Sequence, residues 1–281
     1  MIKTYFSLTK PGIIFGNLIT AAAGFILASK NHFNGWIFFA TLIGLAFVIA
    51  SACVFNNYID RLHDEKMERT KNRALVKGII SPKNALVFAS FLILFGTLTL
   101  SWFTNLLTLC VALTGFLVYV FLYSSWKYRS MHATLIGSIS GGIPPVAGYC
   151  AVSNTVDVGA FLLFMIVVLW QMPHFFAIAL YRLDDYVAAA IPVLPVKKSM
   201  QVTKIHMLLY IISFSLITPM LTLFGYTGYL YLIVSSLLAL TWLWLCIKGF
   251  KSNDNKVWAR KMFVFSLVII TVVSGMISLD G

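Results

Sequence analysis

Charged residues are scarce in this chain of 281 residues: they make up 11% of the sequence, and nine of them are acidic. Soluble domains carry about 25% charged residues. Apolar residues reach 60%, and the mean hydropathy is +0.89. Too few polar side chains are available to cover a water-soluble fold, and the high hydrophobicity equally excludes a disordered chain. The sequence therefore predicts a polytopic membrane protein.

Paired cysteines and metal-spaced histidines are also missing. The four cysteines lie in apolar stretches without a Cys-x-x-Cys pair, and the five histidines form no His-x-x-x-His pair. These absences argue against a disulfide framework and against a Cys/His metal site. We expect small, buried thiols at Cys53, Cys110, Cys150 and Cys246.

Nine apolar stretches are long enough to cross a bilayer as helices, which requires about 20 residues each. They are continuous rather than alternating, which favours helices over barrel strands. The predicted fold is all-α, one transmembrane domain over residues 1–281. We read the first stretch as a retained span, because Pro11-Gly12 opens it and no cleavage pattern ends it. The predicted spans are 11–29, 36–56, 84–103, 105–125, 134–152, 158–180, 205–224, 226–247 and 260–279.

Basic residues lie almost entirely on one side of the predicted bundle. Of the 21 Lys and Arg residues, only Lys30 falls in a loop on the opposite side. The positive-inside rule therefore predicts a cytoplasmic N-terminus and an outer C-terminus. The net charge of +12 then reflects topology and contact with anionic lipid, so no nucleic-acid partner is expected.

An acidic row and a basic row follow each other at the inner end of the second span. Asn56, Asp60 and Asp64 share one face of a helix because they are four residues apart. Such oxygen ligands suit Mg²⁺, which completes its octahedron with water and substrate phosphate. Asp–Arg pairing at a helix end is the alternative, but an amide at Asn56 is costly there without a partner. The basic residues suited to the same phosphates are Lys66, Arg69, Lys71 and Arg73.

The sixth predicted span carries Trp170-Gln171-Met172-Pro173-His174, and an acidic loop with Asp184 and Asp185 follows it. Polar groups at this depth normally face a cavity or a partner helix. His174 suits a haem ligand, a proton acceptor or an interhelical hydrogen bond. We expect a kink at Pro173 and a break in the fifth span at Pro144-Pro145. Because spans two and six both end in acidic loops, two related halves are expected to face one cavity.

These motifs resemble those of the UbiA superfamily of intramembrane prenyltransferases along essentially the whole chain. The resemblance rests on Thr9-Lys10-Pro11-Gly12, Asn56-Asn57-Tyr58-Ile59-Asp60, Met67-Glu68-Arg69-Thr70, Trp170-Gln171-Met172-Pro173-His174 and Pro192-Val193-Leu194-Pro195. Two of these segments, the one from Trp170 to His174 and the one from Met67 to Thr70, resemble a branch of the superfamily that acts on haem. The resemblance implies nine helices around a central cavity, Mg²⁺-dependent ionisation of farnesyl diphosphate, and farnesyl transfer to a vinyl group of haem b. Water then completes the hydroxyethylfarnesyl group of haem O.

The resemblance also implies roles for individual residues. Asn56, Asp60 and Asp64 would bind the metal, and together with Arg69 and Arg73 they form the catalytic set. Lys66, Lys71, Lys127 and Arg129 would add to diphosphate binding, with Arg129 the better match because Lys127 is displaced by one position. His174, Arg182 and Tyr186 would bind haem, while Asp184 and Asp185 form a reduced second acidic motif. The implied setting is the bacterial inner membrane, with haem-copper oxidase assembly or haem A synthase as candidate partners.

Three other interpretations remain. A UbiA-type enzyme acting on an aromatic quinone precursor predicts a complete second Asp-x-x-x-Asp motif, which Arg182-Leu183-Asp184-Asp185-Tyr186 does not provide. A secondary transporter predicts ion-binding groups near the bilayer midplane, whereas the acidic row lies at the end of a span. A structural or assembly role would leave the adjacent acidic and basic rows unexplained.

Overall fold

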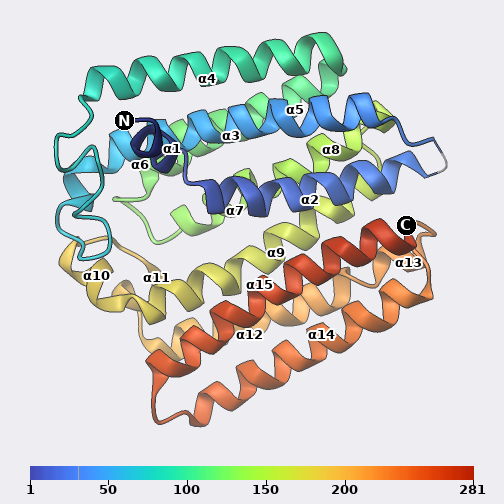
Figure 1. Cartoon of the computed structure of the whole chain (residues 1–281). Coiled ribbons are helices and arrows are strands. Elements are labelled where there is room, and N and C mark those ends of the chain that lie inside the picture. Colours follow the sequence, from blue (N-terminus) through green and yellow to red (C-terminus); the bar gives the residue numbers. More distant parts are fainter. Residues whose placement is uncertain (31) are drawn as a thin grey trace.

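The computed structural model describes residues 1–30 and 32–281 as a bundle of long helices (Figure 1). Over this part of the chain there is no β-strand, and nine helical segments are long and apolar enough to cross a membrane, which confirms the all-α prediction. The uninterrupted spans are α2 (Pro11–Ser29), α3 (Gly35–Asp64), α4 (Pro82–Phe103), α9 (Val158–Tyr181) and α15 (Asn255–Asp280).

The remaining spans are composite. One joins α5 (Leu106–Leu117), a π-helical turn (Val118–Tyr123) and α6 (Ser124–Trp126). Another joins α7 (Ala133–Gly141) to α8 (Ile143–Ser153), a third joins α12 (Met200–Ile217) to α13 (Met220–Leu223), and the last joins α14 (Tyr229–Lys248) to a 3₁₀ turn (Gly249–Lys251). Each therefore contains a local irregularity where the helical pattern changes.

The second predicted span ends at residue 56, and α3 continues beyond it to Asp64, as the predicted helix face of Asn56, Asp60 and Asp64 requires. Asp60 and Asp64 in this extension are buried, and each accepts from a cationic side chain. α12 and α15 begin about five residues earlier than predicted. The Ser199 hydroxyl caps α12 by accepting from the Val202 N–H, and the Asp254 carboxylate caps α15 by accepting from the N–H groups of Lys256 and Val257.

The expected break in the fifth span lies at Gly142, and Pro144 and Pro145 occupy the first turn of α8, where proline is well tolerated. α8 packs against α2 at very short range. A Cβ atom at Gly24 would lie 2.1 Å from the Pro145 carbonyl oxygen, and one at Gly148 would lie 2.0 Å from the Ala21 carbonyl oxygen. Glycine thus permits this crossing. α9, in contrast, remains helical through Pro173.

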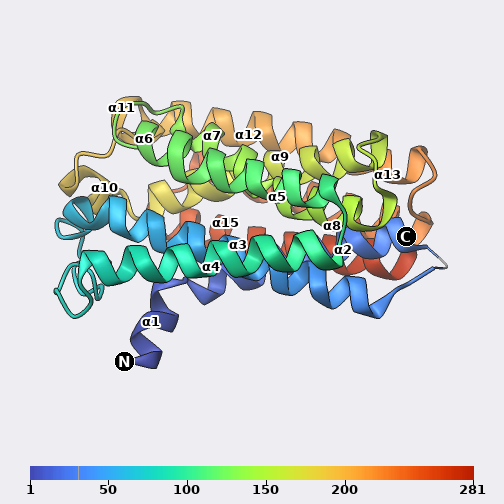
Figure 2. The same ribbon diagram turned by 90° about the horizontal axis from the view of Figure 1, so that it is seen from above.

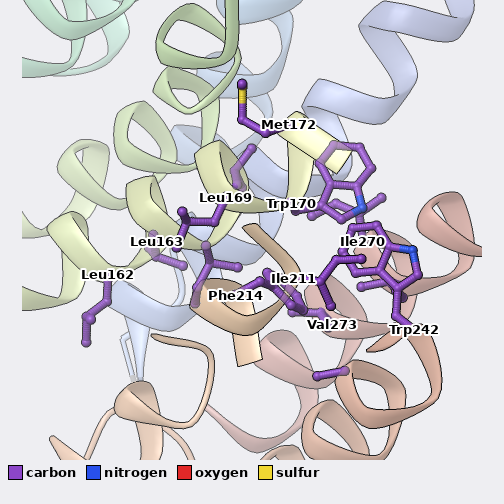
Figure 3. Packing of buried hydrophobic residues seen from close by; sticks show 14 of the residues in the cluster. Leu162, Leu163, Leu169, Trp170, Met172, Ile211, Phe214, Trp242, Ile270 and Val273 are labelled. Atoms are coloured by element: carbon purple, nitrogen blue, oxygen red, sulfur yellow. The ribbon is translucent and has the colours of Figure 1, made fainter. Parts of the chain in front are cut away.

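The main core lies between α9, α12, α14 and α15. Figure 3 shows members of this cluster from all four helices, among them Trp170 of α9, Phe214 of α12, Trp242 of α14 and Ile270 of α15, with Met172 at the upper edge of the view. Cys53, Cys150 and Cys246 are buried as predicted, but Cys110 is exposed, because α5 turns that side chain outward. All four thiols are free.

The long connecting segments gather at one end of the bundle. Figure 1 places the loop between α3 and α4 there, together with α10 (Leu183–Ala188) and α11 (Leu194–Lys197), while the C-terminus lies at the other end. The short N-terminal helix α1 (Ile2–Leu8) also lies near the loop-rich end and projects from the side of the bundle (Figure 2). Chemistry carried by the loops is therefore concentrated at one end.

Candidate functional site

A cavity of about 960 Å³ extends from the loop-rich end into the middle of the bundle. Its inner wall is mainly apolar, with Leu45, Val48, Val167 and Ile270 among the contributing residues. Charged side chains line the part nearer the loops. The volume falls within the range of small-molecule sites, and the combination of an apolar wall with a few polar groups is typical of them.

The predicted acidic row of α3 faces this cavity. Asn56, Asp60 and Asp64 all line it and are nearly fully buried, with exposed fractions of 2%, 2% and 4%. Each accepts from one cationic side chain: Lys10 Nζ lies 2.6 Å from Asn56 Oδ1, Lys127 Nζ lies 2.6 Å from Asp60 Oδ2, and Arg73 Nη1 lies 2.5 Å from Asp64 Oδ2. A row of oxygen atoms is therefore matched by a row of cations.

Lys10 is a site residue that the sequence analysis did not assign. It precedes α2 with a left-handed backbone, φ 54°, which aims its side chain toward α3. Burial lowers the pKa of its ammonium group from 10.5 to about 8. The Thr9-Lys10-Pro11-Gly12 motif was the available signal, but no spacing rule connected it to Asn56.

A second contact holds Asp60 from the other side. The Tyr128 hydroxyl donates to Asp60 Oδ1 at 2.5 Å, and the His63 ring stacks on Tyr128 with 3.6 Å between ring centroids. Burial and the nearby Asp60 carboxylate raise the pKa of Tyr128 above its ordinary value. Burial would lower the pKa of Lys127, but Tyr123 and Asp60 outweigh it, and the net shift is upward. Lys127 therefore remains a cation and Tyr128 a neutral donor at pH 7.

The other predicted basic residues divide into two groups. Arg69 and Arg73 line the cavity, as the diphosphate prediction requires. Lys66 and Arg129 are exposed and lie outside the cavity wall, and Lys71 pairs with Glu68 at 2.6 Å. The structure thus brings Lys127, rather than the favoured Arg129, to the acidic row.

The π-helical turn supplies two further cavity residues that the sequence analysis missed. The Tyr119 and Tyr123 rings stack with 5.3 Å between their centroids, and both line the cavity. π-helical turns occur frequently at functional sites because they rotate side chains out of the regular helical order. A simple helical reading of this span could not place these two rings.

The second acidic loop supports the first instead of presenting carboxylates to the cavity. Asp185 is buried and accepts from the Glu68 backbone N–H at 3.2 Å. Asp184 is exposed and lies 3.5 Å from Lys256. Tyr186, one of the predicted haem residues, lines the cavity.

His174 lines the cavity from α9. Its Nδ1 atom lies 2.7 Å from Ser266 Oγ, and its ring packs near Trp170 and Phe263, with centroid distances of 4.8 and 5.1 Å. Arg182 is exposed outside the cavity wall, with its guanidinium 4.7 Å from the centroid of the Tyr181 ring. Of the three predicted haem residues, the structure therefore brings His174 and Tyr186 to the cavity.

The donor set of α3 fits a hard cation that takes few protein ligands. Within residues 1–30 and 32–281, no three His, Cys, Asp or Glu side chains come together in a metal-binding cluster. The two carboxylates and one amide of Asn56, Asp60 and Asp64 leave most positions of an octahedron to water and ligand oxygens, as is typical of Mg²⁺. A metal here would therefore take its remaining ligands from water or from a bound molecule.

Known proteins resemble this chain over its full length. The profile of the UbiA prenyltransferase family matches residues 17–268. A protoheme IX farnesyltransferase of Protochlamydia amoebophila is 56% identical over 280 residues, covering 100% of this chain and 99% of the relative. A protoheme IX farnesyltransferase of Sodalis glossinidius is 56% identical over 282 residues, covering 100% of this chain and 95% of the relative.

Solved structures share the fold at lower identity. A digeranylgeranylglyceryl phosphate synthase superposes with a TM-score of 0.81 at 19% identity, covering 99% of this chain and 98% of that one. A UbiA homolog from Archaeoglobus fulgidus, bound to GPP and Mg²⁺, superposes with a TM-score of 0.71 at 15% identity, covering 98% and 99%. The helical architecture and the full-length sequence similarity agree. This chain belongs to the UbiA prenyltransferase family.

Proposed function

We propose that this protein transfers the farnesyl group of farnesyl diphosphate to a vinyl group of haem b, with addition of water, to give haem O. The observation that carries the proposal is its 53–56% identity, over the full length, to relatives named protoheme IX farnesyltransferase. The cavity supports it, because cations and oxygen ligands line one end while apolar side chains line the interior. A quinone-precursor prenyltransferase is less favoured, because Asp184 and Asp185 do not form a second carboxylate pair at the cavity.

Diphosphate chemistry belongs at the loop-rich end. Asn56, Asp60 and Asp64 would hold Mg²⁺, which when bound neutralises charge on the leaving diphosphate. Lys10, Lys127 and Arg73 already lie on these oxygen atoms. With these oxygen atoms bound to Mg²⁺, the three cations would be available to the diphosphate, and Arg69 would add a fourth. Positive charges gathered at this end would stabilise the departing diphosphate.

The acceptor belongs deeper in the cavity. His174 and Tyr186 would contact haem b, and Arg182 at the loop-rich end is suited to pair with a propionate. The apolar wall keeps bulk water from the allylic cation until the vinyl carbon reaches it. Ionisation and carbon–carbon bond formation thus take place in two adjoining parts of one cavity.

We also propose that the protein lies in the bacterial inner membrane with the loop-rich end in the cytoplasm. The basic loops at that end support this orientation through the positive-inside rule, and the C-terminus lies at the opposite end (Figure 1). Haem A synthase or an oxidase assembly factor would receive the product. A reporter fused after Gly281 should report an external location, and a cytoplasmic signal would contradict the orientation.

The direct test uses purified protein in lipid with haem b, farnesyl diphosphate and Mg²⁺. Mass spectrometry of the extracted haem should show a gain of one farnesyl group plus water, lost with chelator and in Asp60→Ala. Glu65→Ala is the matched control, because Glu65 is an exposed carboxylate just beyond the same helix. Farnesyl transfer to a quinone precursor instead would favour the alternative acceptor. If farnesyl diphosphate neither binds nor reacts, the enzyme assignment fails and transport becomes the leading interpretation.

A further inference from the structure

Gln171 carries an amide that lines the cavity in the middle of the bundle. Its side chain lines the cavity from α9 and is 6% exposed. Among residues 1–30 and 32–281, the buried side-chain atoms without a hydrogen-bond partner belong to Asn57, His63 and Trp242. The Gln171 amide differs from these because it lines the cavity, where water or a polar ligand can bond to it. Its position therefore indicates a polar ligand inside the cavity.

The Gln171 amide fits in its present position because residue 141 is glycine and has no side chain. A Cβ atom at position 141 would lie 2.2 Å from Gln171 Oε1 and 2.5 Å from its Nε2. Any larger residue at the end of α7 would push the amide away from its present place. The space therefore depends on residues from two helices, α7 and α9, that are separated in the sequence.

His174, one helical turn along α9, presents a free nitrogen lone pair to the same cavity. The Ser266 hydroxyl donates to the Phe263 carbonyl at 2.5 Å, so it can only accept from His174 Nδ1, 2.7 Å away. This chain of hydrogen bonds puts the proton of a neutral His174 on Nδ1 and leaves Nε2 as an acceptor. Gln171 and His174 are three residues apart and share one helix face.

Gln171 lies deeper in the bundle than Asp60, the central carboxylate of the acidic row. Gln171 is ten residues before the end of α9 and Asp60 is four before the end of α3, and these two ends lie at the same end of the bundle (Figure 1). Six residues of difference correspond to about 9 Å along a helix. A diphosphate bound at Asp60 would therefore extend its prenyl chain toward Gln171.

We propose that the Gln171 amide holds the water that completes the reaction and that His174 Nε2 accepts its proton. This rests on the proposed function. The bond between farnesyl C1 and the diphosphate oxygen breaks, and its electron pair stays on the diphosphate. The vinyl π electrons form the new carbon–carbon bond, which leaves a cation on the vinyl carbon next to the porphyrin ring. The water oxygen bonds to that carbon and releases a proton to Nε2, so no oxidant or reductant is required.

The test is the identity of the product. In Gln171→Leu, which keeps the approximate shape without the amide, farnesyl transfer should continue while water addition becomes inefficient. The cation then loses a proton, giving a farnesylated haem lighter than the hydroxylated product by one water. We expect the ratio of hydroxylated to dehydrated product to fall about tenfold, as loss of one hydrogen bond predicts. A merely structural role would lower the yield of both products together.

Gly141→Ala provides a second test that retains Gln171, and it carries the test if Gln171→Leu fails to fold. It should displace the amide and shift the product ratio in the same direction. Ser138→Ala, on the same helix, is the matched control, because the buried Ser138 hydroxyl bonds within α7 to the Leu135 carbonyl. An unchanged ratio in both Gln171→Leu and Gly141→Ala would overturn the role of the amide. Absence of any prenylated haem from the unaltered protein would overturn the proposed function instead.

His174→Ala separates proton acceptance from iron ligation. We expect more dehydrated product, with the visible absorption spectrum of bound haem b unchanged. A spectrum typical of a lost axial ligand would assign His174 Nε2 to the iron and overturn its role as proton acceptor.

Discussion

Lys127 Nζ lies 2.6 Å from Asp60 Oδ2, so the central carboxylate of the acidic row is paired before any ligand arrives. In the same way, Lys10 donates a hydrogen bond to Asn56, and Arg73 forms an ion pair with Asp64. A metal ion that enters alone must displace these cations from their partners without supplying new ones. A metal ion that enters with diphosphate supplies new partners for all of them.

Mg²⁺ and pyrophosphate are therefore expected to bind cooperatively. Together they should raise the melting temperature of the detergent-solubilised protein by several degrees, more than the sum of their separate effects, because ligands of the folded state stabilise it by mass action. Differential scanning fluorimetry with each ligand alone and with both measures this. In Asp60→Asn the two ligands together should raise the melting temperature by no more than the sum of their separate effects. A full shift with Mg²⁺ alone would contradict the exchange of partners.

Tyr128→Phe removes one donor to Asp60 while keeping the ring that stacks on His63. The affinity for Mg²⁺–pyrophosphate should fall about 10- to 100-fold, as is typical when a group that orients a metal ligand is lost. Isothermal titration calorimetry measures the affinity. Tyr229→Phe, exposed at the far end of the bundle, is the control and should bind normally. Equal affinities in the two variants would show that the hydroxyl does not orient Asp60.

The stability of the ligand-free protein should depend on Lys10 at alkaline pH. Burial lowers the pKa of Lys10 from 10.5 to about 8 in the folded state. Between these values the unfolded chain binds more protons than the folded chain, so the free energy of unfolding rises with pH in this window. In Lys10→Met this contribution to the free energy of unfolding should be absent, because methionine does not titrate. Denaturant unfolding from about pH 7 to pH 10 should show the unaltered protein gaining stability relative to the variant; a constant difference would refute the shift.

The crossing of α2 and α8 should not tolerate a methyl group. In Gly24→Ala the added Cβ would lie 2.1 Å from the Pro145 carbonyl oxygen, which is backbone and cannot swing aside. Overpacking of this kind costs about 1–3 kcal/mol, and the melting temperature should fall by several degrees. Gly275→Ala is the matched control, because a Cβ there meets nothing within 4 Å. Its stability should be unchanged or slightly higher. Equal melting temperatures in both variants would mean that the two helices can move apart.

Spacing and hydropathy predicted most of the fold and the centre of the site. The four-residue spacing of Asn56, Asp60 and Asp64 correctly placed them on one helix face, and long apolar runs correctly placed the spans. The cationic partner of Asp60 could not be predicted, because Lys127 lies 67 residues further along the chain. No local pattern contains that information.

The missed residues have similar causes. Lys10 reaches Asn56 through a left-handed turn, and Tyr119 and Tyr123 face the cavity through a π-helical turn. Neither irregularity has a strong local signature. Lys127 and Arg129 are two residues apart and therefore face different directions, so a shift of one position in a motif decides which of them reaches Asp60.

The contact between Asp185 and the Glu68 backbone joins two loops that are 117 residues apart. Met67, Ala189 and Ile191 reinforce the junction with a small apolar cluster of their own. The segment with Arg69 and Arg73 therefore cannot swing outward without carrying Tyr186 along. Arg69, Arg73 and Tyr186 thus belong to one part of the cavity wall, which contacts between the two loops hold together.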